Sequence, residues 1–157
     1  MQIKMKLKRF ISNPLLKLIK LKFVLVGVPV IIQNNDGKIL LEKRANYLPT
    51  YPGYWGLPGG LMNKGEHSQQ TAEREIKEEL GVKIRIIKKS KNIYEPLPTK
   101  ECPTQYINIV YHAKISQGIP KPKNETSEIS WFKPSEIKKI KLAYNHSNIL
   151  KKEGIIK

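Results

Sequence analysis

Three glutamates in residues 74–81 stand at spacings that bring them together on one face of a helix. Glu75 precedes Glu78 by three residues and Glu79 by four. Residues three or four apart are neighbours on a helix surface. Carboxylates this close repel one another and raise the pKa of at least one of them, so such a face needs cations. Hard oxygen ligands without histidine or cysteine among them favour Mg²⁺ or Mn²⁺ over zinc.

The surrounding sequence decides between a metal site and an ordinary solvated acidic face, which glutamate-rich helices also present. Residues 60–82 read GLMNKGEHSQQTAEREIKEELGV, which resembles the Nudix box of the Nudix hydrolases at every defining position. The fixed identities are Gly60, Glu66, Arg74, Glu75, Glu78, Glu79 and Gly81, joined by aliphatic Ile76 and Val82. A chance match has a probability on the order of 10⁻⁹ per start position at average composition.

The resemblance implies a reaction and a role for each residue. Nudix hydrolases cleave a nucleoside diphosphate linked to another group X, using divalent metal and water. By resemblance, Glu78 and Glu79 are the principal ligands, and Glu75 is a further ligand or the base for the water. Arg74 lies one turn before Glu78 and is expected to orient a box carboxylate. The expected catalytic residues are Glu75, Glu78, Glu79 and Arg74, and the expected metal ligands are Gly59 (through its carbonyl), Glu66, Glu75, Glu78 and Glu79.

Part of the family places a catalytic base outside the box, on a late loop. Glu101, Glu125 and Glu128 are the candidates here, and the sequence does not choose among them.

The substrate-binding candidates precede the box. Tyr47 and Tyr51 belong to a loop rich in proline, glycine and aromatic residues over 45–60, where they either stack on a nucleobase or pack within the loop. Arg44, just before this loop, is the third candidate. Trp55 is expected in the core, because large apolar groups are usually buried.

Two features are similar to the ADP-ribose pyrophosphatase branch of the family. Pro96 and Pro98 flank the place, about fifteen residues past the box, where that branch tends to carry a proline; Leu97 occupies the place itself. The segment LAYNHSNIL (142–150) is similar to a late segment of the branch, with Asn145 in place of its aspartate. ADP-ribose or a related nucleotide sugar is therefore the expected substrate. The alternatives are a nucleoside triphosphate of the 8-oxo-dGTP type, a dinucleoside polyphosphate or RNA cap, and a non-catalytic nucleotide-binding module.

The elements that must position these residues are several strands and a few helices, and this mixture indicates an α+β fold with a mixed sheet. Strands are predicted at 23–33, 38–44, 82–87, 105–115 and 127–132, with a hairpin turn at 34–37. Helices are predicted at 69–80, capped by Ser68 and ended by Gly81, and at 134–140 and 146–152. The resemblance implies a Nudix domain over residues 22–150, an α/β/α sandwich around a mixed β-sheet, followed by a tail at 151–157.

Composition and charge bound the remaining properties. The 157 residues predict one domain, and the single cysteine, Cys102, excludes an intrachain disulfide and favours the cytoplasm. No apolar run reaches the ~20 residues that span a bilayer, so no membrane partner is expected. The net charge of +16 suits a nucleotide substrate. Nucleic acid is not the expected partner, although the basic charge would permit it. Residues 1–21 form a basic N-terminal extension that a possible homodimer could use.

Overall fold

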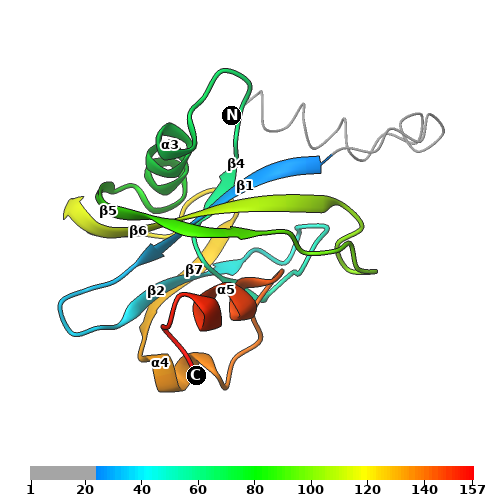
Figure 1. The fold of residues 1–157 in the computed structure, drawn as a ribbon. Coiled ribbons are helices and arrows are strands. Elements are labelled where there is room, and N and C mark those ends of the chain that lie inside the picture. The colour runs from blue at the N-terminus through cyan, green and yellow to red at the C-terminus, as the bar shows by residue number, and fades with distance from the viewer. Residues whose placement is uncertain (1–23) are drawn as a thin grey trace.

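The computed structural model describes residues 24–157, so the N-terminal extension predicted over residues 1–21 lies outside the described part of the chain. Four strands precede helix α3, three strands follow it, and the short helices α4 and α5 end this part of the chain (Figure 1). The bounds are Val24–Ile32 (β1), Ile39–Arg44 (β2), Trp55–Gly56 (β3), Gly59–Leu61 (β4), Ser68–Leu80 (α3), Lys83–Tyr94 (β5), Gln105–Gln117 (β6), Thr126–Phe132 (β7), Pro134–Ile137 (α4) and His146–Lys152 (α5).

The strands form two sheets. The first has the order β4-β1-β6-β5. It is mixed, as predicted, because β1 runs parallel to β6 whereas the β1–β4 and β5–β6 pairs are antiparallel. The second has the order β3-β2-β7 and is antiparallel throughout. The turn at 34–37 therefore joins two strands of different sheets, and the hairpin predicted there pairs only through the Gln33–Ile39 bridge.

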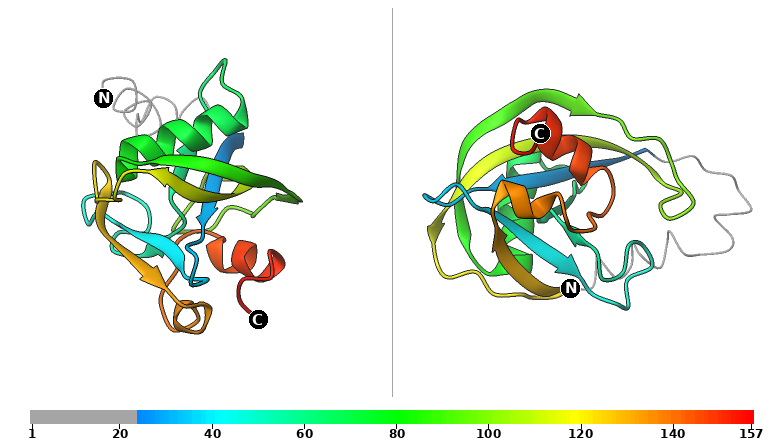
Figure 2. Two further views of the ribbon diagram at one scale, coloured as in Figure 1. Left: turned by 90° about the vertical axis from the view of Figure 1, so that its left-hand side faces the viewer. Right: turned by 90° about the horizontal axis from the view of Figure 1, so that it is seen from below.

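The side-chain alternation along β1 separates two hydrophobic cores. Val28, Val30 and Ile32 pack in the core that includes Ala72, Ile76 and Leu80 of α3. Ile31, which points to the opposite face, packs in the core built with α4 and α5. Since successive strand residues face opposite sides of a sheet, one strand serves both cores. The strands thus lie between α3 and the α4–α5 pair (Figure 1 and Figure 2), which confirms the α/β/α sandwich.

The ends of α3 follow the predicted pattern with one correction. Gly81 ends the helix in the left-handed conformation, with φ 72°, as predicted. The N-cap is His67 rather than Ser68, and the His67 N–H donates to Gln70 Oε1 at 2.8 Å. Ser68 is the first helical residue, and its Oγ instead shares a hydrogen bond of 2.8 Å with Tyr111 Oη.

Two other segments carry more structure than the pattern predicted. Strand β5 continues beyond residue 87 to Tyr94, and of its polar residues Lys88, Lys89, Lys91 and Asn92 are exposed on this outer strand of the first sheet, whereas Ser90 is half-buried. Helix α5 ends at Lys152, as predicted, but residues 153–157 of the expected tail still pack on the domain, because Ile156 is buried in the second core. No helix within residues 24–157 is long and apolar enough to cross a membrane.

Candidate metal centre and substrate site

The acidic face of α3 lies at the edge of the first core. Glu75 is 1% exposed and Glu79 is 6% exposed, whereas the Glu78 side chain is 38% exposed at the rim. Strand β4 passes so close to this face that a Cβ on Gly60 would lie 2.4 Å from Glu75 Cδ. A side chain at position 60 would therefore displace the Glu75 carboxylate.

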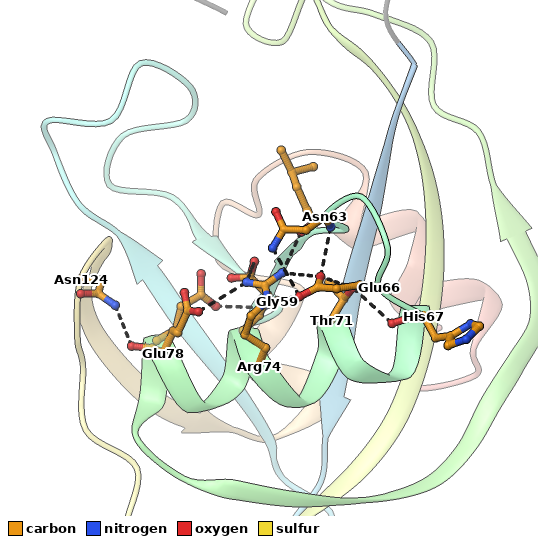
Figure 3. A network of polar contacts seen from close by, with 11 residues as sticks. Gly59, Asn63, Glu66, His67, Thr71, Arg74, Glu78 and Asn124 are labelled. Carbon is orange, nitrogen blue, oxygen red and sulfur yellow. Dashed lines mark hydrogen bonds and ion pairs between the residues drawn. The ribbon is translucent and has the colours of Figure 1, made fainter. Parts of the chain in front are cut away.

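Arg74 holds the carboxylates of this face together (Figure 3). Its Nε and Nη2 donate to the two oxygens of Glu66 at 2.6 and 2.9 Å. Its Nη1 donates to Glu75 Oε1 at 2.6 Å and lies 3.6 Å from Glu78 Oε1. The sequence predicted this orienting role for Arg74, and the geometry brings Arg74, Glu66, Glu75 and Glu78 into one network.

Glu66 is held by more than Arg74. Its Oε2 also accepts from the Asn63 N–H at 3.0 Å and from Thr71 Oγ1 at 2.9 Å. The hydrogen bonds from Arg74 are the main reason that the pKa of Glu66 falls to about 2, since donors to a carboxylate favour its charged form. The charged Glu66 carboxylate fixes Arg74, and Arg74 in turn fixes Glu75.

Glu79 connects the helix to β4, which precedes the box. The Gly59 N–H donates to Glu79 Oε2 at 3.0 Å. The backbone of Gly59, whose carbonyl is an expected metal ligand, therefore lies next to the Glu79 carboxylate, which is another. Gly59 has φ 134°, and a Cβ there would lie 2.2 Å from the Val28 carbonyl oxygen. Only glycine fits this close approach.

The chemistry of the candidate ligands fits a hard divalent cation, but their side chains do not converge on one point. Within residues 24–157, no three His, Cys, Asp or Glu side chains converge closely enough to hold a metal ion. Glu75 is turned to Arg74 and Glu79 to the Gly59 N–H. The candidate metal ligands are carboxylates and a backbone carbonyl, which are oxygen donors of the kind that Mg²⁺ and Mn²⁺ prefer.

Glu42 is a buried carboxylate beside this centre that the sequence analysis did not single out. It is 7% exposed, and Thr126 Oγ1 donates to its Oε2 at 2.7 Å. Burial raises the pKa of Glu42 to about 7, and the nearby Glu125 and Glu75 carboxylates add to the rise. The alternation of β2 could have identified it, because Leu40, two residues earlier, faces the same core.

Arg44 and Tyr51 meet in a second cluster, together with residues that the sequence analysis missed. The Arg44 guanidinium lies 5.0 Å from the centroid of the Tyr144 ring, and the Tyr51 ring packs edge-on to Tyr144 at 4.9 Å. Thr50 joins them, since Arg44 Nη2 donates to Thr50 Oγ1 at 3.1 Å. Tyr106 completes the aromatic set at 5.9 Å from Tyr144. We call these residues the tyrosine cluster: Arg44, Thr50, Tyr51, Tyr106 and Tyr144.

The tyrosine cluster has the properties of a binding surface. Within residues 24–157, Arg44 has no carboxylate in ion-pair contact. Tyr51 and Tyr144 both have positive φ, 49° and 53°, a conformation that costs energy in non-glycine residues and gathers at functional sites. An amide pair also belongs to this region, with Asn108 Nδ2 donating to Asn145 Oδ1 at 3.2 Å.

The remaining candidates from the sequence lie in different surroundings. Tyr47 is 72% exposed, and its hydroxyl donates to the Asn124 carbonyl at 2.9 Å. Trp55 is half-buried against Phe132 at the second core. Of the three candidate outside bases, Glu128 pairs with Lys43 at 3.1 Å and Glu101 is exposed. Glu125 is half-buried and close enough to Glu42 to raise its pKa.

Residues 24–152 match the family model of the NUDIX domain. The chain belongs to the Nudix family. An ADP-ribose pyrophosphatase from Methanocaldococcus jannaschii is 34% identical to this Nudix chain over 126 residues, which cover 80% of the chain and 70% of the relative. An m7GpppN-mRNA hydrolase from Xenopus laevis is 26% identical over 120 residues, and the alignment covers 68% of this chain but only 40% of that relative.

Solved structures agree with the Nudix fold. The crystal structure of a MutT protein from Methanosarcina mazei Go1 superposes with a TM-score of 0.71 at 24% identity, covering 84% of this chain and 93% of that one. With the family established, residues 60–82 are its Nudix box, and the Arg74 network is built almost wholly from that box.

Proposed function

We propose that this chain is a Mg²⁺-dependent hydrolase of the pyrophosphate linkage in a nucleoside diphosphate derivative, with ADP-ribose or a related nucleotide sugar as its substrate. The observation that carries the proposal is the Nudix box arranged around Arg74, which holds Glu66 and Glu75 at 2.6 Å. Enzymes of the Nudix family act on phosphoanhydride bonds of nucleotide derivatives and generally use divalent metals.

Glu78 and Glu79 would hold the metal, with Glu75, Glu66 and the Gly59 carbonyl as the further candidates. A bound Mg²⁺, or Mn²⁺ in its place, supplies neutralisation of charge on phosphate oxygens and an acidified water. Glu79 could keep its hydrogen bond from the Gly59 N–H while holding the metal, because a carboxylate has two oxygens and several lone pairs. The Glu78 side chain, which is 38% exposed, is the more accessible of the two.

Arg74 determines what Glu75 can do. Its Nη1 fixes Glu75 Oε1 at 2.6 Å, which sets the orientation of the carboxylate that either binds metal or accepts the proton of the attacking water. Glu66 keeps Arg74 in place through both of its oxygens. Bidentate arginine–carboxylate pairs give this kind of geometric control.

The tyrosine cluster and the adjoining amides are the proposed nucleoside site. A nucleobase can stack on the half-buried rings of Tyr51 and Tyr144, since aromatic faces favour stacking. The amides of Asn108 and Asn145 supply donors and acceptors for its edge. Arg44, which lacks a carboxylate partner in the described residues, is the group for a phosphate or sugar oxygen.

The 34% identity to an ADP-ribose pyrophosphatase favours ADP-ribose over the alternatives. The cap hydrolase relative and the net charge of +16 favour an RNA cap as the second candidate, because a basic surface attracts RNA. A nucleoside triphosphate of the 8-oxo-dGTP type and a non-catalytic role remain as outcomes of the test. A cytoplasmic location and a homodimer remain predictions, and light scattering of the full chain tests the latter.

The test is a substrate panel with purified protein and Mg²⁺, with products separated by chromatography and Glu78→Gln as the control. The panel holds ADP-ribose, other nucleotide sugars, 8-oxo-dGTP, diadenosine polyphosphates and capped RNA. AMP with ribose 5-phosphate from ADP-ribose, lost in the variant, is the expected result. Release of pyrophosphate from a triphosphate, or of a cap nucleotide from capped RNA, would show that the proposed hydrolysis acts on that substrate instead of ADP-ribose. Binding without turnover would refute catalysis.

A further inference from the structure

The last turn of α3 is capped by a segment far from it in sequence. The final four carbonyls of a helix lack partners within the helix. The Gly81 N–H donates to the Lys77 carbonyl at 3.1 Å, which leaves three. Residues 118–125, which we call the capping loop, supply all three partners. Asn124 Nδ2 donates to the Glu78 carbonyl at 2.8 Å, the Lys123 N–H to the Glu79 carbonyl at 2.9 Å, and the Lys121 N–H to the Leu80 carbonyl at 3.0 Å.

Two of the three capped carbonyls belong to Glu78 and Glu79, the proposed principal metal ligands. The contact with Glu78 differs from the other two because a side chain makes it (Figure 3). Backbone N–H groups are present in any non-proline residue, so the Lys121 and Lys123 contacts do not depend on those side chains. The contact from Asn124 requires a short side chain with an amide donor.

The backbone of Asn124 supports the same role. It has φ 53°, a left-handed conformation that asparagine tolerates better than most residues. On its other side, the Asn124 carbonyl accepts from Tyr47 Oη at 2.9 Å. Tyr47 belongs to the loop that also carries Tyr51, so Asn124 connects the loop of the proposed nucleoside site with the end of the metal helix.

We propose that Asn124 is a positioning residue for the metal centre, and that its side chain fixes the backbone of Glu78 so that the carboxylate starts from the correct place. Helix ends fray, and their local unfolding costs little free energy. A ligand in the last turn therefore binds metal less tightly when its backbone is unrestrained. This inference rests on the proposed function, because it requires Glu78 to be a metal ligand.

The test measures Mn²⁺ affinity of the full chain by electron paramagnetic resonance of the free ion, without substrate. Asn124→Gly removes the amide and leaves a residue that adopts φ 53° freely. Asn124→Asp keeps the size of the side chain, removes the donor and adds a negative charge that is unfavourable at a helix C-terminus. We expect Asn124→Gly to bind Mn²⁺ about five-fold more weakly, the factor that corresponds to one hydrogen bond of about 1 kcal/mol, and Asn124→Asp also to bind it more weakly than wild type. At low Mg²⁺ the weaker metal binding should also lower kcat, and excess Mg²⁺ should restore most of it. A general loss of structure would not be reversed by added Mg²⁺.

Ser127→Ala is the matched control. Ser127 Oγ donates to the Lys43 carbonyl at 3.1 Å, an exposed side-chain-to-backbone bond of the same kind that does not touch α3, and its loss should leave Mn²⁺ affinity unchanged. Wild-type affinity in both Asn124 variants, with Glu78→Gln binding weakly, would overturn the role of Asn124 alone. Unchanged affinity in Glu78→Gln would overturn the metal site itself.

Discussion

Replacement of Arg74 by lysine tests whether its guanidinium group orders the proposed catalytic carboxylates. Lysine keeps the positive charge and loses the planar set of donors. It can replace at most part of the bidentate pair with Glu66, and it gives up the 2.6 Å contact with Glu75 Oε1. The Arg74 side chain is only 23% exposed, so these charge-assisted bonds are weakly screened by solvent.

The size of the effect follows from the contact with Glu75. A hydrogen bond to a charged group contributes about 1.5–3 kcal/mol. If that stabilisation is used in the transition state, Arg74→Lys lowers kcat by about 10- to 150-fold at saturating Mg²⁺. The KM for substrate changes little, because Arg74 is expected to orient Glu75 rather than to contact the substrate.

The assay is steady-state hydrolysis of the panel's best substrate by wild type, Arg74→Lys, Glu66→Gln and the double variant. If Glu66 acts only by holding Arg74, the double variant should be no slower than Arg74→Lys alone. Additive effects of the two substitutions would show that Glu66 acts independently, for instance as a direct metal ligand. A kcat for Arg74→Lys within about two-fold of wild type would refute the orienting role of Arg74, since it lies far below the loss expected from one charge-assisted bond.

Three further predictions concern pH dependence and substrate binding. The pKa of Glu42 is raised to about 7, so its contribution to stability is complete below its unfolded pKa near 4.5 and is lost as the pH rises through 7. In urea unfolding of the metal-free protein between pH 5 and 8, Glu42→Gln should flatten this decline in stability. Burial opposes ionisation of Glu153, yet hydrogen bonds from Ser90, Tyr94, Asn92 and His112 lower its pKa to about 2, so its stabilisation is complete above pH 4.5 and lost below it. Glu153→Ala should destabilise the fold by about 2–4 kcal/mol, because buried donors lose their acceptor; a change below 0.5 kcal/mol in urea unfolding would contradict this. Arg44→Ala should raise KM about ten-fold with little change in kcat, and steady-state kinetics showing the reverse pattern would assign Arg44 to the chemical step.

Helix α3 could be predicted almost completely from sequence. Its apolar stripe of Ala72, Ile76 and Leu80, its acidic face and its terminal glycine all repeat at helical spacing. The N-cap was misplaced by one residue, because Ser68 bonds to Tyr111 on β6, a tertiary contact that local pattern does not contain.

The sheet was predicted less completely. Residues 88–92 of β5 are polar, so they lack the apolar alternation that identifies a strand. Their place in β5 depends on pairing with β6, which Lys88 and Lys89 make directly before the register is interrupted up to Ile93. The division into two sheets likewise depends on long-range pairing, since β2 leaves β1 to join β3 and β7.

The tyrosine cluster was predicted only in part. Arg44 and Tyr51 are close in sequence, but Tyr106 comes from β6 and Tyr144 from the segment before α5. No spacing rule joins residues so far apart, and only the packing of α5 against the sheet brings them together. Glu42, in contrast, had a usable local signal in the alternation of β2.

The parallel pairing of β1 with β6 has a consequence for the order of folding. Val24 pairs with Gln105, whereas β5 and β6 are antiparallel neighbours along the chain. Closing the longer loop costs more chain entropy, so the β5–β6 pair forms first and β1 joins it late. Until then, the apolar run of β1 and one edge of β6 are uncovered, and such edges recruit other chains. The yield of refolded protein should therefore fall as its concentration rises. At the opposite edge of the sheet, the lysines along β5 disfavour pairing with another chain because like charges repel.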